Sequence, residues 1–146
     1  MIKFKQRISP PTDKDMWWIA TSKGGLNSCK VETAKTGSVL PSAVGYVFGR
    51  YSEILNQTCS LSCATAGQLY LHTEDGYNRG TDPQLGAVMC WSGSTDNGHV
   101  AIVEAIAKNG DITTSEYYKG AWARKTRSPG QYKLAGEESR TFQGFI

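Results

Sequence analysis

The segment after Pro41 carries apolar residues at a helical spacing, at Val44, Val47, Phe48, Tyr51, Ile54 and Leu55. Ser42 is a favourable N-cap residue, so the pattern predicts a helix from about Ala43 to Leu55. Gly45 and Gly49 lie four residues apart and share one side of this helix. An interior glycine costs roughly 1 kcal/mol relative to alanine, and we therefore expect that side to pack closely against a sheet.

The pattern changes to β after Gly86. Short apolar or alternating runs predict strands over residues 87–91, 99–106, 112–116, 121–127 and 141–146. Asn109-Gly110 is a favourable hairpin turn between the second and third of these strands. Helices followed by an antiparallel sheet indicate the α+β class.

The remaining segments are less regular. A second helix is expected to begin near residue 60 or 62 and to end before Asp75. Residues 21–40 contain three glycines and show no clear period, so we expect a long ordered loop there. Trp17 and Trp18 either anchor a loop on the core or line a groove.

Length and composition are those of an ordinary globular chain. The 146 residues are 39% hydrophobic and 20% charged, which predicts one domain with its own core over residues 1–146, expected to be a monomer. The net charge is +3 and no run of Lys and Arg is long enough for a nucleic-acid patch, so nucleic acid is not an expected partner. No apolar run resembles a signal peptide or a membrane span, so we expect synthesis in the cytoplasm without an export signal and no membrane partner.

The four cysteines do not form a recognisable metal or disulfide pattern. They are Cys29, Cys59, Cys63 and Cys90. Four are too few for a disulfide scaffold in a chain of 146 residues, and no set of four ligands has a zinc spacing. The glycine-containing stretch before the helix has one acidic residue, Glu32, and offers no calcium loop. We therefore predict four free thiols, no metal and no cofactor.

Three positions carry the candidate chemistry. Ala43 begins the predicted helix, where backbone N–H groups and the helix dipole favour negative charge. His99 opens a strand directly after a turn, and Glu116 ends its hairpin partner. If the hairpin turns at Asn109-Gly110, residue 120 lies opposite His99, four residues beyond Glu116. Either a bulge or a longer turn brings the two side chains together, or a neighbouring strand supplies the carboxylate.

This order of residues matches a known catalytic arrangement. A nucleophile at a helix N-terminus, a histidine on a following strand and a polar partner on the next strand form the papain-like layout. Taken singly, each signal also has a structural explanation, because a histidine at a strand end and a solvated glutamate are common. Ala43 itself can perform no chemistry. Serine and cysteine elsewhere are poor substitutes: Ser42 is more simply a cap, and Cys90 lies in an apolar strand.

Several short motifs occur in order along the chain. They are Leu-Pro-Ser-Ala-Val-Gly-Tyr at 40–46 with Gly49-Arg50, Gly-Ala-Val at 86–88 with Trp91, Gly-His-Val-Ala-Ile-Val at 98–103, Thr-Ser-Glu at 114–116 and Phe-Gln-Gly-Phe-Ile at 142–146. Together they resemble the CHAP family (cysteine, histidine-dependent amidohydrolase/peptidase), especially endolysins from phages of Gram-positive bacteria. The resemblance implies a papain-like CHAP fold, with N-terminal helices packed on an antiparallel β-sheet.

The resemblance also implies roles for individual residues. The position of Ala43 would be a cysteine nucleophile in the active form, His99 the general base and Glu116 its orienting carboxylate. Many relatives carry Asn two residues after that glutamate, where this chain has Tyr118. Ala43 then represents either an engineered Cys→Ala change or a natural loss of the reaction. Trp91, Tyr118 and Trp122 are candidate substrate-binding walls, or else core residues.

The implied function is hydrolysis of an amide bond in the peptidoglycan of a Gram-positive bacterium, with peptidoglycan as the partner. The enzyme would act on the cell wall after release from the host cytoplasm. Any C-terminal wall-binding domain is not in this chain, which ends where the resembling domain ends. Two alternatives remain open, an inactive wall-binding or toxin-inhibiting module and a cysteine protease that acts on proteins.

Overall fold

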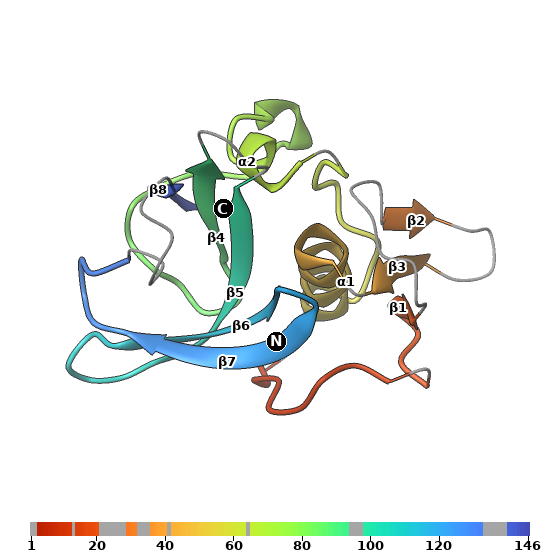
Figure 1. Cartoon of the computed structure of the whole chain (residues 1–146), viewed down its shortest axis with the longest axis horizontal. Coiled ribbons are helices and arrows are strands. Elements are labelled where there is room, and N and C mark those ends of the chain that lie inside the picture. Colours follow the sequence, from red (N-terminus) through yellow and green to blue (C-terminus); the bar gives the residue numbers. More distant parts are fainter. Residues whose placement is uncertain are drawn as a thin grey trace.

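A computed structural model describes residues 3–12, 14–20, 29–31, 36–40, 42–63, 65–93, 98–132 and 140–146. One helix, α1 (Ala43–Leu55), lies between two sheets (Figure 1). The larger sheet is antiparallel with the order β7-β6-β5-β4-β8, and the smaller has the order β1-β3-β2. The predicted α+β class, with a helix on an antiparallel sheet, is confirmed.

The bounds of α1 agree with the predicted helix, and its start is formed by local contacts. Ser42 has extended backbone dihedrals, and its hydroxyl accepts a hydrogen bond from the Gly45 N–H at 3.1 Å. The helix ends at Asn56, which adopts the left-handed conformation with φ 55°. The two cap residues therefore define where the helix begins and ends.

Gly49 allows the helix to approach the smaller sheet. A Cβ atom at Gly49 would lie 2.3 Å from Nε1 of Trp18 in β1 (Trp18–Ala20), a separation that no packed side chain tolerates. The indole donates a hydrogen bond to the carbonyl of Tyr46 at 3.2 Å and stacks on the Tyr46 ring. The close approach expected for this side of the helix is confirmed at Gly49. Trp17 and Trp18 are both buried and thus anchor the N-terminal region on the core.

The larger sheet consists of β4 (Val88–Gly93), β5 (His99–Ile106), β6 (Ile112–Tyr118), β7 (Ala121–Arg127) and β8 (Arg140–Phe145). All five strands occur where the alternation predicts them, within one or two residues at each end. Side chains on one face pack with α1, namely those of Val88, Cys90, Val100 and Ile102. The other face carries a second cluster, formed by Ala87, Met89, Trp91, Ala101, Val103, Ile112 and Phe145. Apolar residues on both faces explain why the central strands read as continuous apolar runs.

The expectation of a loop over residues 21–40 is wrong for part of that stretch. It contains β2 (Cys29–Val31) and β3 (Thr36–Leu40), while residues 21–28 and 32–35 lie outside the described ranges. β3 pairs in parallel with β1 and antiparallel with β2. These short strands depend on pairing between distant segments and on support from α1, and neither leaves a local period in the sequence.

The predicted second helix is much shorter than expected. It consists of a single turn, α2 (Ala66–Leu69), followed by the 3-10 turn η1 (Thr73–Asp75). The guanidinium of Arg79 donates to the carbonyls of Leu69, Tyr70 and His72 at 2.8–3.0 Å. These hydrogen bonds satisfy carbonyl groups at and just after the C-terminal end of α2.

A buried ion pair fastens α1 to the larger sheet. Arg50 donates two hydrogen bonds of 2.8 Å to the Glu104 carboxylate, whose oxygens also accept from the Ser115 hydroxyl and the Arg7 backbone N–H. Tyr46 in turn donates to the Ser115 hydroxyl at 2.6 Å. Since each carboxylate oxygen has two donors, the buried charge is well compensated.

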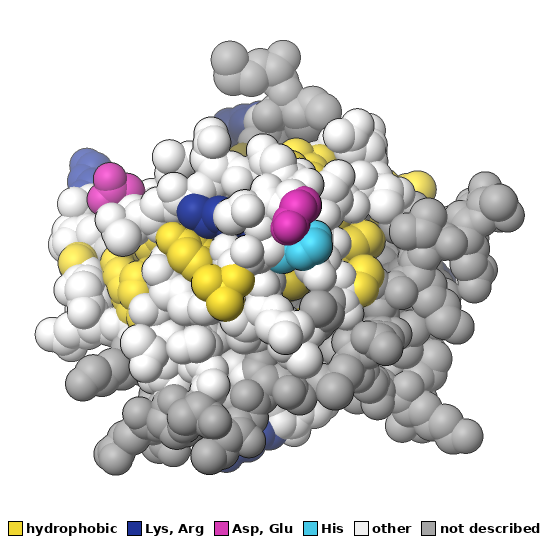
Figure 2. Space-filling view, turned by 90° about the horizontal axis from the view of Figure 1, so that it is seen from above, with side chains coloured by type: hydrophobic (Ala, Val, Ile, Leu, Met, Phe, Trp, Pro, Cys, Tyr) yellow, Lys and Arg dark blue, Asp and Glu magenta, His cyan; other side chains and the backbone are white. Residues whose placement is uncertain are grey.

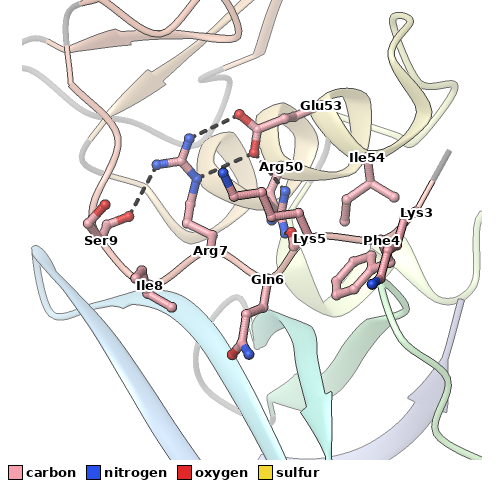
Figure 3. Close-up of a pocket in the computed structure, with 10 residues that line it drawn as sticks. All are labelled: Lys3, Phe4, Lys5, Gln6, Arg7, Ile8, Ser9, Arg50, Glu53 and Ile54. Atoms are coloured by element: carbon pink, nitrogen blue, oxygen red, sulfur yellow. Dashed lines mark hydrogen bonds and ion pairs between the residues drawn. The ribbon is translucent and has the colours of Figure 1, made fainter.

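Two cavities lie beside the second half of α1. The first, of about 490 Å³, separates the N-terminal residues 3–9 from Arg50, Glu53 and Ile54 (Figure 3). Arg7 reaches across it to the Glu53 carboxylate at 2.9 Å. The second, of about 540 Å³, lies between the end of α1, the loop over residues 77–87 and the last two residues. Neither cavity is lined by Ala43, His99 or Glu116.

Candidate active site

His99 and Glu116 form a buried hydrogen-bonded pair. Nε2 of His99 contacts Oε2 of Glu116, and the two residues are 2% and 0% exposed. The pairing of Ile106 with Ile112 beside the turn is already one residue away from the expected register. A bulge between Val103 and Ala105 shifts the register of β5 and β6 by one further residue. Extending the pairing of Ile102 with Ser115 places Glu116 diagonally next to His99 on the same face, within reach of long side chains. No third strand is needed to supply the carboxylate, and the predicted proximity of the two residues is confirmed.

Glu116 is held as a carboxylate by further donors. Its Oε1 lies 3.2 Å from the Thr114 hydroxyl and 3.2 Å from Nη2 of Arg127, while Nη1 of Arg127 donates to the same hydroxyl at 2.7 Å. Burial alone raises the pKa of the Glu116 carboxyl. The His99 hydrogen bond and the charges of His99, Arg127 and Lys125 outweigh burial and lower the pKa to about 2. The group is therefore ionised at neutral pH.

The imidazole of His99 lies between two aromatic rings. Trp91, its cross-strand partner on β4, lies 5.5 Å away between ring centroids, and Tyr118 meets it edge to face at 5.3 Å. The preceding Gly98 has φ 75°, and a Cβ there would lie 2.3 Å from the Trp91 carbonyl oxygen. Only glycine fits that position without strain, which explains the Gly-His pair at the start of the strand.

Ala43 lies toward the same end of the sheet. It is the first residue of α1, and Tyr46, about 4.5 Å further along the helix axis, bonds to the residue before Glu116. Arg50 bonds to Glu104, near the far end of β5, so α1 and β5 run in the same direction. The start of the helix is thus brought to the end of the sheet where His99 begins β5.

The helix and the pair do not share a face of the sheet. The Tyr46 ring packs against Tyr117, on the face of β6 opposite to that of Glu116. Likewise, Val100 and Ile102 pack with α1, whereas His99 alternates with them. A side chain at position 43 would therefore have to reach the imidazole around the end of the sheet and not across its face.

The three candidate wall residues occupy different environments. Trp91 is 0% exposed, and its indole N–H donates to the Tyr132 carbonyl. The ring is thus fixed in place as a buried neighbour of His99. Tyr118 and Trp122 are partly exposed, although Trp122 also packs against the helix-side core. Substrate contact by the three stays a prediction, and in this structure Tyr118 and Trp122 have surface with which to make it.

Other possible nucleophiles are occupied or inaccessible. Burial raises the pKa of the Cys90 and Cys59 thiols, and both side chains lie in the helix-side core. The Ser42 hydroxyl caps α1. Cys59 and Cys90 have free thiols, while the side chain of Cys29 lies outside the described part.

The second histidine, His72, is not part of this site. Its Nδ1 lies 3.4 Å from Glu74, and both side chains are exposed, at 46% and 78%. Figure 2 shows a histidine beside an acidic side chain on the upper surface. An exposed pair of this kind contributes little energy.

Within the described ranges, no group of three or more His, Cys, Asp or Glu side chains is arranged to hold a metal ion. The helices described there are also too short or too polar to cross a membrane.

The sequence analysis did not select Arg127 and Thr114, which donate hydrogen bonds to Oε1 of Glu116. Both lie on strands that the alternation predicts. Arg127 could have been found from the hairpin register, since β7 pairs with β6 so that Arg127 is diagonal to Thr114. A charged residue at the end of a strand, however, is more often a solvated one.

Comparison with known proteins identifies the family. The family model of the CHAP domain matches residues 36–118, more than half of the 146 residues. The matched range includes Ala43, His99 and Glu116. The chain belongs to the CHAP family. This is a family of peptidoglycan amidases and peptidases, and the predicted membership of the CHAP family and the papain-like CHAP fold are confirmed.

A solved structure supports the same fold. The chain is similar to an N-acetylmuramoyl-L-alanine amidase from Staphylococcus aureus, with a TM-score of 0.54 and 21% sequence identity. The similarity covers 79% of this chain and 33% of the amidase, so this CHAP chain spans about a third of that protein. No curated protein matches the sequence.

Proposed function

We propose that this CHAP chain is the catalytic domain of a phage endolysin, which hydrolyses an amide bond of Gram-positive peptidoglycan when cysteine occupies position 43. The observation that carries the proposal is the buried His99–Glu116 pair at the end of the sheet where α1 begins. Peptidoglycan is then the partner, which the enzyme reaches after release from the cell that makes it. No metal or cofactor is needed for this chemistry.

The pair is suited to general-base catalysis. The ionised Glu116 accepts a hydrogen bond from Nε2 of His99, which favours the tautomer with its proton on Nε2. Nδ1 then carries the free lone pair and can take the proton of a thiol. Arg127 and Thr114 donate to the other carboxylate oxygen, Oε1. They thereby fix the orientation of the carboxylate and, through it, that of the imidazole.

A cysteine at position 43 would complete the reaction. Its thiol proton passes to Nδ1 of His99, and the thiolate, favoured at a helix N-terminus, attacks the amide carbon. The backbone N–H of residue 43 contributes to the oxyanion hole, whose donors typically supply about 3–4 kcal/mol each. Nδ1 then returns the proton to the leaving amine as the C–N bond breaks, and water hydrolyses the thioester.

The chain with Ala43 lacks the attacking atom and should bind substrate without turning it over. An engineered Cys→Ala change best explains why His99 and Glu116, the other residues of the proposed triad, are both present and in contact. Ala43 itself also favours a second candidate function, that of an inactive wall-binding module whose enzyme fold has lost its activity. The two differ in what a restored cysteine does.

The deciding experiment is the Ala43→Cys variant. We expect it to release new amino groups from purified Gram-positive cell walls, whereas Ala43→Ser should do so feebly, because serine must lose its proton during attack. Adding His99→Ala to the Ala43→Cys variant should abolish this activity, and adding Glu116→Ala should reduce it strongly. Circular dichroism would verify that each variant is folded.

Two outcomes contradict the proposal. A folded Ala43→Cys variant that releases nothing from walls, including those of the natural host, would make the binding module the better description. Cleavage of unfolded proteins without cleavage of walls would instead indicate a cysteine protease.

A further inference from the structure

Cations gather around the ring of Tyr118, next to His99. Nζ of Lys125 lies 4.1 Å from the ring centroid, Nζ of Lys119 lies 5.3 Å away, and the Arg140 guanidinium carbon lies 5.9 Å away. The same ring meets the His99 imidazole at 5.3 Å. Positive charges from β7, β8 and the turn between β6 and β7 thus converge on a ring of β6 beside the candidate active site.

The nearest carboxylate does not neutralise this cluster. Glu116 is completely buried and is already paired with His99 and Arg127. Among the described residues, no carboxylate lies within 4.0 Å of the ammonium groups of Lys119 or Lys125. The two lysines therefore bring positive charge to the ring that no described carboxylate neutralises.

The cluster is also accessible. Lys119 is exposed, while Tyr118, Lys125 and Arg140 are partly exposed. Tyr118 and Lys125 project from the same face of the β6–β7 hairpin as Glu116, because Lys125 pairs with Thr114 and alternation places Thr114, Glu116 and Tyr118 together.

We propose that Tyr118, Lys119 and Lys125 form a subsite for a free carboxylate of the peptide that is cleaved. The two ammonium groups offer charge-assisted hydrogen bonds to a carboxylate, and the ring provides a flat wall for the adjoining peptide. The assignment of the ligand to a peptidoglycan stem peptide rests on the proposed function, whereas the preference for a carboxylate rests on the charges.

The test measures binding to the chain as it stands, with Ala43. The two probes are a soluble stem peptide with a free carboxylate and the same peptide with that carboxylate amidated. Calorimetry at low salt should show tighter binding of the free acid, and its advantage should shrink at about 0.5 M salt. Lys125→Gln should weaken binding of the free acid roughly fivefold, equivalent to about 1 kcal/mol, and leave the amidated peptide unaffected.

Lys108→Gln is the matched control. Lys108 is exposed in the turn at the opposite end of the β5–β6 hairpin, so the same loss of charge there should change neither affinity by more than about twofold. Lys125→Gln should leave Glu116 ionised: burial raises the pKa of that carboxyl, but His99 and Arg127 lower it more than Lys125 does. Lost affinity would thus report the subsite and not the catalytic pair.

Equal affinity for the two peptides, or no measurable affinity for either at millimolar concentration, would overturn the subsite. So would an equal loss of affinity in the Lys125 and Lys108 variants. The proposed function fails separately. If Ala43→Cys cleaves no walls while the free acid still binds through Lys125, the subsite stands and the hydrolase does not.

Discussion

Removing the charge of Glu116 should change how the stability of the domain depends on pH. The Glu116→Gln substitution keeps the size of the side chain but removes the carboxylate that contacts His99, Arg127 and Thr114. Burial raises the pKa of this carboxyl, but the His99 hydrogen bond and the charges of His99, Arg127 and Lys125 lower it from 4.5 to about 2. Ionised Glu116 therefore stabilises the folded chain relative to the unfolded one.

The magnitude follows from the two pKa values. A fall from 4.5 to about 2 corresponds to about 3 kcal/mol at 1.36 kcal/mol per pH unit, and the side chain is 0% exposed, so solvent screens it little. Between these pH values the unfolded chain binds a proton that the folded chain does not. The stabilisation is therefore complete above about pH 4.5 and is lost as the pH falls toward 2.

Urea unfolding followed by tryptophan fluorescence, from about pH 2.5 to pH 7, provides the assay. Glu116→Gln should be less stable at pH 7 by about 3 kcal/mol, and its stability should converge with that of the unmodified chain in acid. Asp75 contributes an acid slope of its own: burial raises its pKa, but hydrogen bonds from Arg79 lower it overall. Because this slope is common to both proteins, it cancels in their difference.

Glu74→Gln is the control, since that side chain is 78% exposed and its loss should change stability by less than about 0.5 kcal/mol. The reasoning is refuted if Glu116→Gln loses stability in acid as steeply as the unmodified chain. An unchanged free energy of unfolding at pH 7 would refute it as well.

Two further predictions concern packing and the thiols. Gly49→Ala should destabilise the domain by about 1–3 kcal/mol in urea unfolding, because the new Cβ would lie 2.3 Å from Nε1 of Trp18. Gly80→Ala, with nothing within 4 Å of its Cβ, is the control, and equal effects of the two would contradict this account of the helix packing. A thiol reagent should modify all four cysteines in denaturant, whereas the buried Cys90 should resist it in the folded state. A count of two or fewer in denaturant, or zinc in elemental analysis, would show the prediction of free thiols to be wrong.

Local patterns were sufficient for the main elements. The period of apolar residues and the Ser42 cap predict α1 within its observed bounds, because both signals depend on residues one or two turns apart. The alternation predicts the five strands of the larger sheet in the same way. His99 and Glu116 could be selected from the sequence because each lies at the end of such a strand, and the family motifs run through both.

Pairing between distant segments was not visible in the sequence. β2 and β3 lie in a stretch without a period, and β3 forms because β1 lies parallel to it, more than fifteen residues earlier. Similarly, the carbonyls of Leu69 and Tyr70 at the end of α2 accept hydrogen bonds from Arg79, a residue about ten positions later. A residue's own neighbours in sequence do not reveal such partners.

The tertiary structure also decided how the site is assembled. The bulge between Val103 and Ala105 shifts the register by one residue and so places Glu116 on the same face of the sheet as His99. A one-residue change in register cannot be read from alternation. Arg127 becomes a partner of Glu116 only because β7 folds back on β6. The residue types and their order were thus determined by the sequence alone. The ionisation of Glu116 and the cations around Tyr118 depend on burial and on contacts across strands, which exist only in the folded chain.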